Sequence, residues 1–100
     1  MTWKVLLHPL VLDEDIPRLD KPERARIFKA MRERLATAPH QYGEPLRGEL
    51  FGYWKLRVGD FRVIYKMRKQ IVTVLVLKIG PRRDSEVYAD MVKRLKAFEA

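Results

Sequence analysis

The sequence predicts an α+β fold in which a small, four-stranded, mainly antiparallel sheet packs against helices, in the order β-α-α-β-β-β-α. Three patterns favour this class: a β-hairpin over residues 52–66, an apolar run typical of a central strand over residues 71–79, and helical patterns before and after them. With 100 residues, 47% of them hydrophobic and 34% charged, the chain is expected to form a single domain over residues 1–100.

The N-terminal part is expected to contain one strand and then helices. Residues 3–7 are typical of a short strand, and residues 10–19 of a short helix that is broken or begins near Pro17. The next helix has a clear start, because Asp20 can cap it and Glu23 stands at the capping-box position. Its apolar positions recur at helical spacing and are expected in the core: Ile27, Phe28, Met31 and Leu35.

A loop and a hairpin are expected next. Pro39 should end the helix, and residues 40–51 are rich enough in Pro and Gly to form a loop. Gly59-Asp60 can make a two-residue turn, because glycine tolerates the positive φ of primed turns. Since side chains alternate along a strand, this turn assigns two faces. The apolar face holds Trp54, Leu56, Val58, Phe61, Val63 and Tyr65, and the opposite face holds Tyr53, Lys55, Arg57, Arg62, Ile64 and Lys66.

The C-terminal part predicts a strand and a helix. Residues 71–79 are apolar on both faces, as in a central strand, and Gly80-Pro81 should end it. Asp84 or Ser85 is expected to cap the final helix. The buried stripe of that helix is expected to be Val87, Met91, Leu95 and Phe98.

The net charge of +8 is concentrated in the second half of the chain. Residues 1–50 carry 9 Lys or Arg and 8 Asp or Glu, whereas residues 51–100 carry 12 and 5. The hairpin register also places Arg57 opposite Arg62, a like-charge pair that costs a few tenths to about 1 kcal/mol. We therefore expect an anionic partner, which favours nucleic acid or an acidic protein segment over a membrane surface.

Several chemistries are excluded by composition. The chain has no Cys, which excludes disulfides and thiolate metal sites. Nucleophilic catalysis by a Ser-His-Asp arrangement is not expected either, because the two histidines, His8 and His40, each adjoin a proline in an expected loop. No metal-ligand spacing and no glycine-rich phosphate loop is present. The apolar run at the start is too short for a signal peptide or a membrane span. We expect a cytoplasmic protein with no metal, no small-molecule cofactor and no membrane partner.

Lysine, arginine and tyrosine remain as the residues able to carry chemistry. Lys55 and Arg62 are expected on one sheet face, Arg82 and Arg83 lie between the central strand and the last helix, and Tyr88 stands one turn into that helix. Such a cluster can bind phosphates, stabilise a phosphorane and stack on a base. It holds no obvious proton acceptor near neutral pH, unless crowding by cations lowers the pKa of a lysine.

Four segments follow one another in a characteristic order and spacing: Leu46-Arg47-Gly48, Gly52-Tyr53-Trp54-Lys55-Leu56-Arg57, Phe61-Arg62-Val63-Ile64-Tyr65 and Ile79-Gly80-Pro81-Arg82-Arg83-Asp84-Ser85-Glu86-Val87-Tyr88. Together they resemble the RelE/ParE superfamily of bacterial toxins, on the RelE branch. The resemblance covers nearly the whole chain and implies a RelE-like fold. It implies a toxin of a type II toxin–antitoxin system: a small cytoplasmic endoribonuclease that enters the ribosome and cuts mRNA at the A-site codon by attack of a 2′-OH on the adjacent phosphate. A cognate antitoxin protein silences such toxins.

The same resemblance implies roles for individual residues. Lys55 matches a lysine that acts as general base or charge stabiliser, and Arg62 matches the arginine that stabilises the phosphate. Arg82 matches an arginine proposed to assist the leaving oxygen, and Tyr88 a tyrosine that orients or stacks on RNA. The expected supporting RNA contacts are Arg57, Arg83, Lys66 and Tyr53. Tyr53 replaces a lysine of some members and Pro81 a basic residue, which affects the expected rate and codon preference.

Other interpretations stay open at this point. Lys55 and Arg62 would also suit a merely solvated sheet face, Tyr88 a packing position, and Arg82 a bond to the carboxylates at 84 and 86. At the level of function, the alternatives are a ParE-like inhibitor of DNA gyrase and a non-catalytic RNA-binding module.

Overall fold

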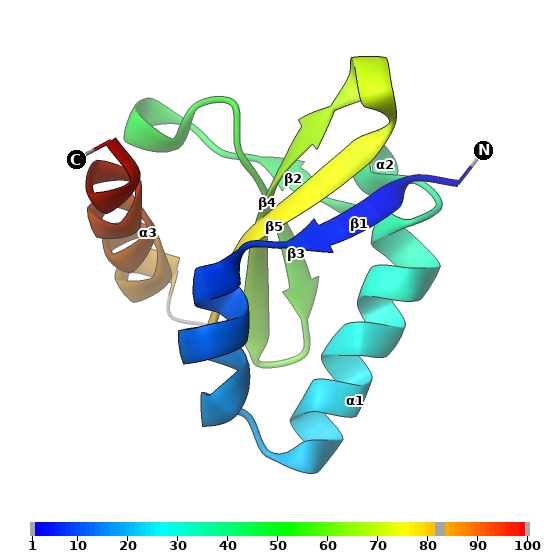
Figure 1. Ribbon diagram of the computed structural model, residues 1–100, viewed down its shortest axis with the longest axis horizontal. Helices are drawn as coiled ribbons and strands as arrows, with labels where there is room; N and C mark the ends of the chain where they lie inside the picture. The colour runs from blue at the N-terminus through cyan, green and yellow to red at the C-terminus, as the bar shows by residue number, and fades with distance from the viewer. Residues whose placement is uncertain (1, 82–83, 100) are drawn as a thin grey trace.

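The computed structural model describes residues 2–81 and 84–99 and places a five-stranded sheet between helices (Figure 1). The strands are β1 (Lys4–Leu7), β2 (Glu44–Pro45), β3 (Trp54–Val58), β4 (Phe61–Arg68) and β5 (Thr73–Pro81). The helices are η1 (Val11–Asp15), η2 (Ile16–Arg18), α1 (Lys21–Ala30), its continuation η3 (Met31–Leu35), α2 (Pro39–Tyr42), η4 (Gly48–Leu50), η5 (Lys69–Ile71) and α3 (Asp84–Glu99). The α+β class is confirmed.

The prediction of a four-stranded, mainly antiparallel sheet was wrong in two details. The strand order is β1-β5-β4-β3-β2, so there are five strands, and β1 runs parallel to β5 with Lys4 opposite Thr73. The extra strand, β2, comes from the segment predicted as a loop and pairs with β3. Two residues are too few for a periodic signal, and Pro45 is tolerated because β2 is an edge strand. The β1–β5 pairing joins segments far apart in sequence, which local patterns do not specify.

The hairpin prediction is confirmed. Gly59 has a φ of +56°, as the primed turn requires. The register pairs Val58 with Phe61, Arg57 with Arg62 and Lys55 with Ile64. The two other predicted pairs that involve β3 residues are also present. The face of every side chain in β3 and β4 follows from this turn.

The helix start at Asp20 is confirmed as well. The Asp20 side chain accepts a hydrogen bond from the Glu23 backbone N–H, and the Glu23 carboxylate accepts one from the Asp20 N–H, both at 2.9 Å. Residues 40–51 differ from the predicted loop, because α2 begins at Pro39 and η4 follows β2. Proline is favoured in the first turn of a helix, so Pro39 starts a new helix rather than only ending the previous one.

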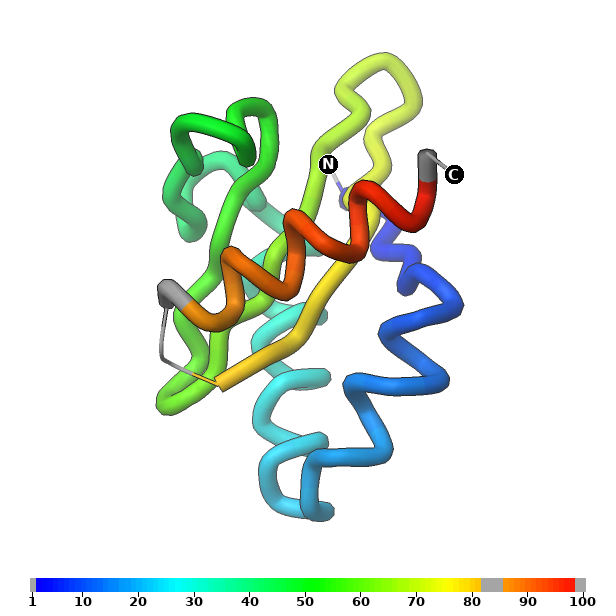
Figure 2. Tube along the Cα trace, turned by 90° about the vertical axis from the view of Figure 1, so that its left-hand side faces the viewer, coloured from blue at the N-terminus to red at the C-terminus, as the bar shows by residue number. Residues whose placement is uncertain are grey.

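The sheet separates two apolar cores, with α1 and η3 on one face and α3 on the other (Figures 1 and 2). The first core contains Ile27, Met31, Leu35, Leu56, Val63, Tyr65 and Val76 among others. The second contains Leu46, Leu50, Ile64, Leu77, Val87 and Met91. Phe98, predicted in the buried stripe of α3, is 37% exposed and stacks on the His8 ring at 4.3 Å. The predicted caps Asp84 and Ser85 lie outside the side chains that the structure describes.

Tyr65 connects the first core to α2 through a hydrogen bond. Its hydroxyl donates a hydrogen bond of 2.6 Å to the Pro39 carbonyl, and burial raises the pKa of its phenol. Gly43 passes directly over this hydroxyl, where a Cβ atom would collide with it. The phenol therefore fixes how the chain returns from α2 to the sheet.

A buried ionic cluster joins η1, β5 and α3. The Arg94 guanidinium binds both Asp15 carboxylate oxygens, at 2.8 and 2.9 Å, and also donates to the Leu77 carbonyl at 2.8 Å. Lys78 Nζ lies 3.3 Å from Asp15, and the Ile79 N–H donates to Asp15 at 2.9 Å. Because β5 continues beyond the end of β1, the Ile79 N–H has no partner on a neighbouring strand at that side, and the Asp15 carboxylate accepts its hydrogen bond instead. None of these contacts was predicted from the sequence.

Removing the Asp15 carboxylate should strongly destabilise the fold. In Asp15→Ala, two buried cations lose their counter-charge, and we expect the free energy of unfolding to fall by about 3–5 kcal/mol in denaturant titrations. Glu14→Ala is the matched control, because Glu14 is exposed and lies 3.7 Å from Arg94. It should cost about 1 kcal/mol or less, and equal effects of the two substitutions would contradict this account.

Candidate nucleic-acid interface

The basic face predicted for the hairpin is partly covered by α3. Ile64 is fully buried and packs with Val87 and Met91 of that helix. Gly80 allows the close approach, since a Cβ there would lie 2.9 Å from Val87 Cγ2. Figure 2 shows α3 crossing in front of the sheet. The basic face is therefore partly occupied by a packed helix and is not an open layer of cations.

Lys55 is held against Tyr88 and Glu44. The Lys55 side chain was predicted to project from the sheet, but the residue is only 7% exposed. Its Nζ atom lies 5.5 Å from the centroid of the Tyr88 ring and 3.9 Å from Glu44 Oε2. The ring face attracts the ammonium and compensates part of its lost hydration. Tyr88 also packs on the second core, so its packing role and its contact with Lys55 coexist.

Arg57 and Arg62 lie opposite each other, as predicted, and each has a nearby negative or polar group. Arg62 Nη1 donates to the Gly59 and Phe61 carbonyls at 3.2 and 3.0 Å. Arg57 Nη2 lies 3.9 Å from Glu44 Oε2, and its side chain is 59% exposed. These contacts direct the two guanidinium groups differently and reduce the like-charge repulsion that the register implies.

A second cation–aromatic pair lies on the same face. Lys66 Nζ is 5.6 Å from the centroid of the Tyr53 ring. Both residues were predicted as RNA contacts, and both are half-buried. Such a pair offers a ring face for stacking and a positive charge for a phosphate within one contact.

Two predicted cations lie outside the described structure, and one carboxylate of this face was not predicted. Arg82 and Arg83 lie outside the described residues; Pro81 ends β5 just before them. Glu44, the carboxylate beside Lys55 and Arg57, was missed, because it lies in the two-residue β2.

Within residues 2–81 and 84–99 no group of three or more metal-ligating side chains occurs. In the same part of the chain, the helices are too short or too polar to cross a membrane.

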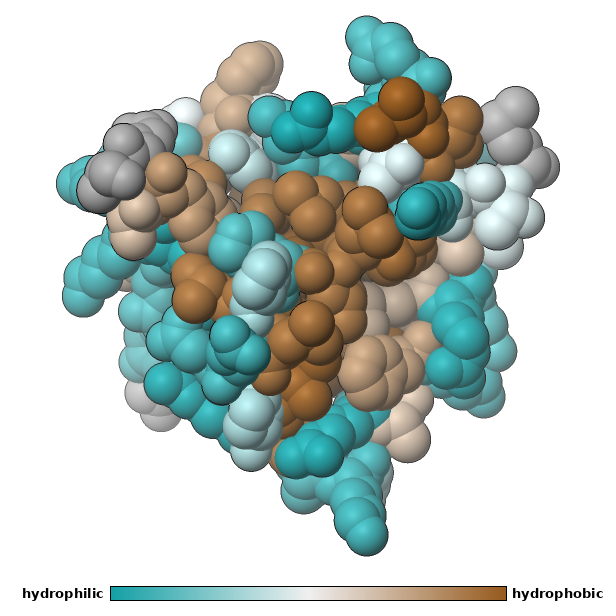
Figure 3. Space-filling view, viewed as in Figure 1, coloured by the Kyte–Doolittle hydropathy of each residue, from teal (hydrophilic) through white to brown (hydrophobic). Residues whose placement is uncertain are grey.

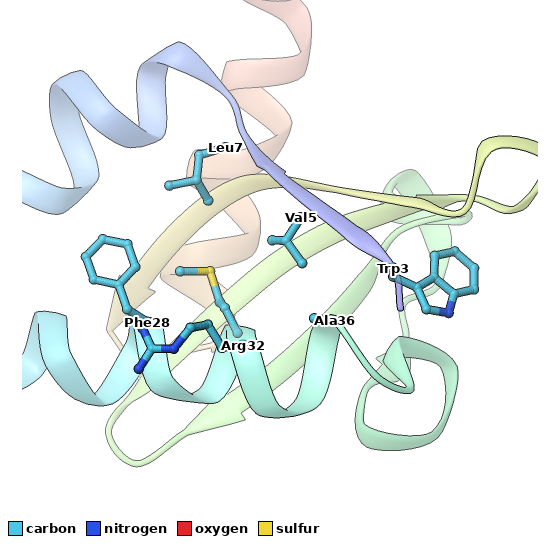
Figure 4. Close-up of a pocket in the computed structure, with 7 residues that line it drawn as sticks. Trp3, Val5, Leu7, Phe28, Arg32 and Ala36 are labelled. Atoms are coloured by element: carbon cyan, nitrogen blue, oxygen red, sulfur yellow. The ribbon is translucent and has the colours of Figure 1, made fainter. Parts of the chain in front are cut away.

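A separate hollow of about 250 Å³ lies between β1 and the α1–η3 helix (Figure 4). It is mainly apolar and is lined by Trp3, Val5, Leu7, Phe28, Met31, Arg32 and Ala36. Figure 3 shows hydrophobic surface over the middle of this view, bordered by hydrophilic residues. Since β1 is an edge strand, an apolar groove and unpaired strand atoms lie side by side here, across the sheet from α3.

The arrangement beside α3 suits a phosphodiester with an adjoining base. Lys55, Arg57 and Arg62 supply positive charge from two paired strands, and Tyr88 and Tyr53 supply ring faces. Arginine and lysine held in place can stabilise charge that develops on a phosphoryl group. Glu44 lowers the net charge near Lys55 and competes with an incoming anion for it.

Comparison with known proteins identifies one family. The family described as "ParE toxin of type II toxin-antitoxin system, parDE" matches residues 11–86. Toxin RelG of Mycobacterium tuberculosis is 36% identical over 50 residues, which are 50% of this chain and 58% of that protein. The mRNA interferase toxin RelE of Escherichia coli is 42% identical over 41 residues, 41% of this chain and 43% of that protein. The chain thus spans about half the length of these two curated relatives.

Two solved structures share the fold over most of their length. The toxin–antitoxin complex RelBE2 of Mycobacterium tuberculosis contains a chain with a TM-score of 0.78 and 26% identity, covering 82% of this chain and 93% of that one. A double mutant of Escherichia coli toxin RelE in the free state has a TM-score of 0.70 and 26% identity, covering 94% of this chain and 98% of that one.

The contact between Lys55 and Tyr88 should be measurable as a coupling energy. A double-mutant cycle of Lys55→Met and Tyr88→Leu, followed by denaturant unfolding, should give a favourable coupling of about 0.5–2 kcal/mol. The control cycle pairs Tyr88→Leu with Lys29→Met, an exposed lysine of α1, and should be additive within about 0.5 kcal/mol. Additivity in both cycles would contradict the cation–aromatic contact.

Proposed function

Because the chain belongs to the ParE toxin family of type II toxin–antitoxin systems, we propose that it is a ribosome-dependent mRNA endonuclease. Within the RelE/ParE superfamily it is similar to RelE. The observation that carries the proposal is the set of positioned cations and ring faces around α3, led by Lys55 against Tyr88 and by Arg62 at the hairpin turn. The curated relative from Escherichia coli is named an mRNA interferase, which supports RNA as the substrate.

The proposed reaction is an internal displacement at phosphorus. The ribose 2′-OH loses its proton and attacks the adjacent phosphate, the bond from phosphorus to the 5′-oxygen breaks, and that oxygen takes up a proton. A 2′,3′-cyclic phosphate and a 5′-hydroxyl result. Arg62 stabilises the phosphate, Lys55 acts as general base or charge stabiliser, Arg82 assists the leaving oxygen and Tyr88 orients the RNA. The supporting contacts are Arg57, Arg83, Lys66 and Tyr53.

We also propose a cytoplasmic location and a cognate antitoxin as the protein partner. A neighbour of the same fold is a toxin–antitoxin complex, which supports such a partner. An amphipathic antitoxin segment with acidic residues would suit both the positive charge of this chain and the apolar groove beside β1, where Arg32 lies among apolar side chains.

Removal of two proposed catalytic arginines should abolish toxicity. We expect induction of the wild-type chain without antitoxin to arrest growth and to produce new mRNA ends within codons. Arg62→Ala/Arg82→Ala should restore growth and intact transcripts, because the charge that stabilises the phosphorane is lost. Mapping of mRNA 5′ ends in both strains makes the comparison.

Lys29→Ala is the matched control for this experiment, because Lys29 is an exposed cation of α1 on the other side of the sheet. It should arrest growth like the wild-type chain. Growth arrest by the double variant at wild-type strength would remove the catalytic assignment.

Purified RNA without ribosomes should be cut poorly. Among the described residues the site offers no obvious acid–base pair for proton transfer near neutral pH, so we expect the rate to depend on the ribosome holding the codon in line for attack. Cleavage rates of one mRNA, measured with and without programmed ribosomes, test this. Comparable rates in the two reactions would contradict ribosome dependence.

The second candidate is a ParE-like block of DNA gyrase, favoured by the match of residues 11–86 to the ParE toxin family. It predicts intact mRNA together with accumulation of cleaved DNA after induction. A third candidate, a non-catalytic RNA-binding module, predicts salt-sensitive RNA binding without cleavage products.

A further inference from the structure

Two projecting segments lie at the same end of the molecule, away from the β3–β4 turn. One is the loop formed by η4 and the residue after it, Phe51; the other is the tip of the β4–β5 hairpin around η5. Both rise at the upper edge of Figures 1 and 2. The cleavage reaction proposed above assigns no role to Phe51 or to the exposed cations Arg68 and Lys69 of the tip.

The η4 loop holds Phe51 away from the protein. The residue is 83% exposed, although burial of a phenylalanine side chain favours folding. The loop is not loose, because Leu50 is anchored in the second core and the Phe51 N–H donates to the Gly48 carbonyl at 3.1 Å. Gly48 and Gly52, which flank it, both have positive φ, at 63° and 96°. The backbone of this loop therefore keeps the ring exposed.

The hairpin tip presents cations from a hydrogen-bonded turn. Val72 adopts a left-handed conformation, with φ 48°, which is strained for a β-branched residue. Its N–H donates to the Lys69 carbonyl at 3.2 Å, and the Thr73 hydroxyl donates to the Ile71 carbonyl at 2.9 Å. Residues 66–73 contain no acidic side chain. Arg68 and Lys69 therefore have no acidic neighbour within their own hairpin tip.

The Tyr53–Lys66 pair connects the two segments. Tyr53 follows Phe51 by two residues, and Lys66 precedes Arg68 by two. Alternation along β4 places Lys66 and Arg68 on the same sheet face. Tyr53 and Lys66 are in contact, and Phe51, Arg68 and Lys69 lie on the two segments beside them. These five residues bring ring faces and positive charges to one end of the molecule and are here named the upper platform. At about 3.4 Å per residue, Arg68 lies about 20 Å along the strand from Arg62.

We propose that the upper platform binds single-stranded RNA beyond the phosphate that is cut, with a base stacked on Phe51 and phosphates held by Arg68 and Lys69. Exposed rings combined with cations are the usual means by which proteins hold single strands without reading sequence. The proposal rests on the proposed function for the identity of the nucleic acid, and it extends the contact from one codon to a longer segment.

The test is the affinity of the full chain for a short unstructured RNA oligonucleotide, measured by fluorescence anisotropy at several salt concentrations. Phe51→Ala should weaken binding on the order of tenfold and leave the salt dependence unchanged, because a stacked base is lost but no charge. Arg68→Ala/Lys69→Ala should reduce the slope of log affinity against log salt by about 1.4, or about 0.7 for each phosphate contact.

The chain offers matched controls for both variants. Leu12 is 52% exposed, so Leu12→Ala controls for loss of an exposed apolar side chain. Lys21→Ala/Lys29→Ala removes two exposed charges of α1. Thermal unfolding verifies that every variant is folded. The proposal would be overturned if the Phe51→Ala variant bound the RNA as tightly as the Leu12→Ala variant does. It would also be overturned if the two double variants had equal salt slopes. Equal weakening of duplex RNA binding by Phe51→Ala would also overturn it, because duplex bases are not free to stack.

Cleavage assays on the same variants separate this proposal from the proposed function. If the wild-type chain binds RNA with these signatures but does not cut mRNA, the platform stands and the nuclease proposal fails. If the chain cuts mRNA and the signatures are absent, the platform fails and the nuclease proposal stands.

Discussion

The buried carboxylate of Asp15 is the interaction on which the rest of the structure depends. It accepts two bonds from Arg94, so it fixes the position of α3 on the sheet. It also accepts the Ile79 N–H, where β5 extends past β1. Because α3 then crosses the sheet at a set place, Tyr88 comes to lie over Lys55. An ionic contact deep in the fold thus sets the geometry of the surface proposed to act on RNA.

That surface combines two opposing demands. The second core needs α3 packed on the sheet, whereas an anion-binding site needs exposed cations on the same face. Alternation along β3 and β4 satisfies both, since Ile64 lies under the helix while Arg57 and Arg62 lie at the turn beyond it. Lys55 lies between these regions, nearly buried and compensated by a ring face and a carboxylate. The cations of this face are therefore combined with a hydrophobic contact between helix and sheet.

The two proposed RNA contacts differ in their physical basis. Around Lys55 and Arg62 the groups are held by bonds and packing, which suits stabilisation of a transition state. On the upper platform, Phe51 and Arg68 are exposed on hydrogen-bonded turns, which suits reversible binding of a strand. Their separation along β4 allows affinity and catalysis to depend on different residues, within a family whose members act as toxins of type II toxin–antitoxin systems.

The sequence by itself determined the local structure: the capping box at Asp20, the turn at Gly59 and the faces of the hairpin depend on neighbouring residues and on fixed backbone geometry. Only the tertiary structure decided the parallel pairing of β1 with β5, the short strand around Glu44 and the buried contacts of Asp15 and Lys55. These features join segments distant in sequence, and burial of a charge depends on what packs over it. A pattern of alternation specifies which way a side chain points, but not what covers it.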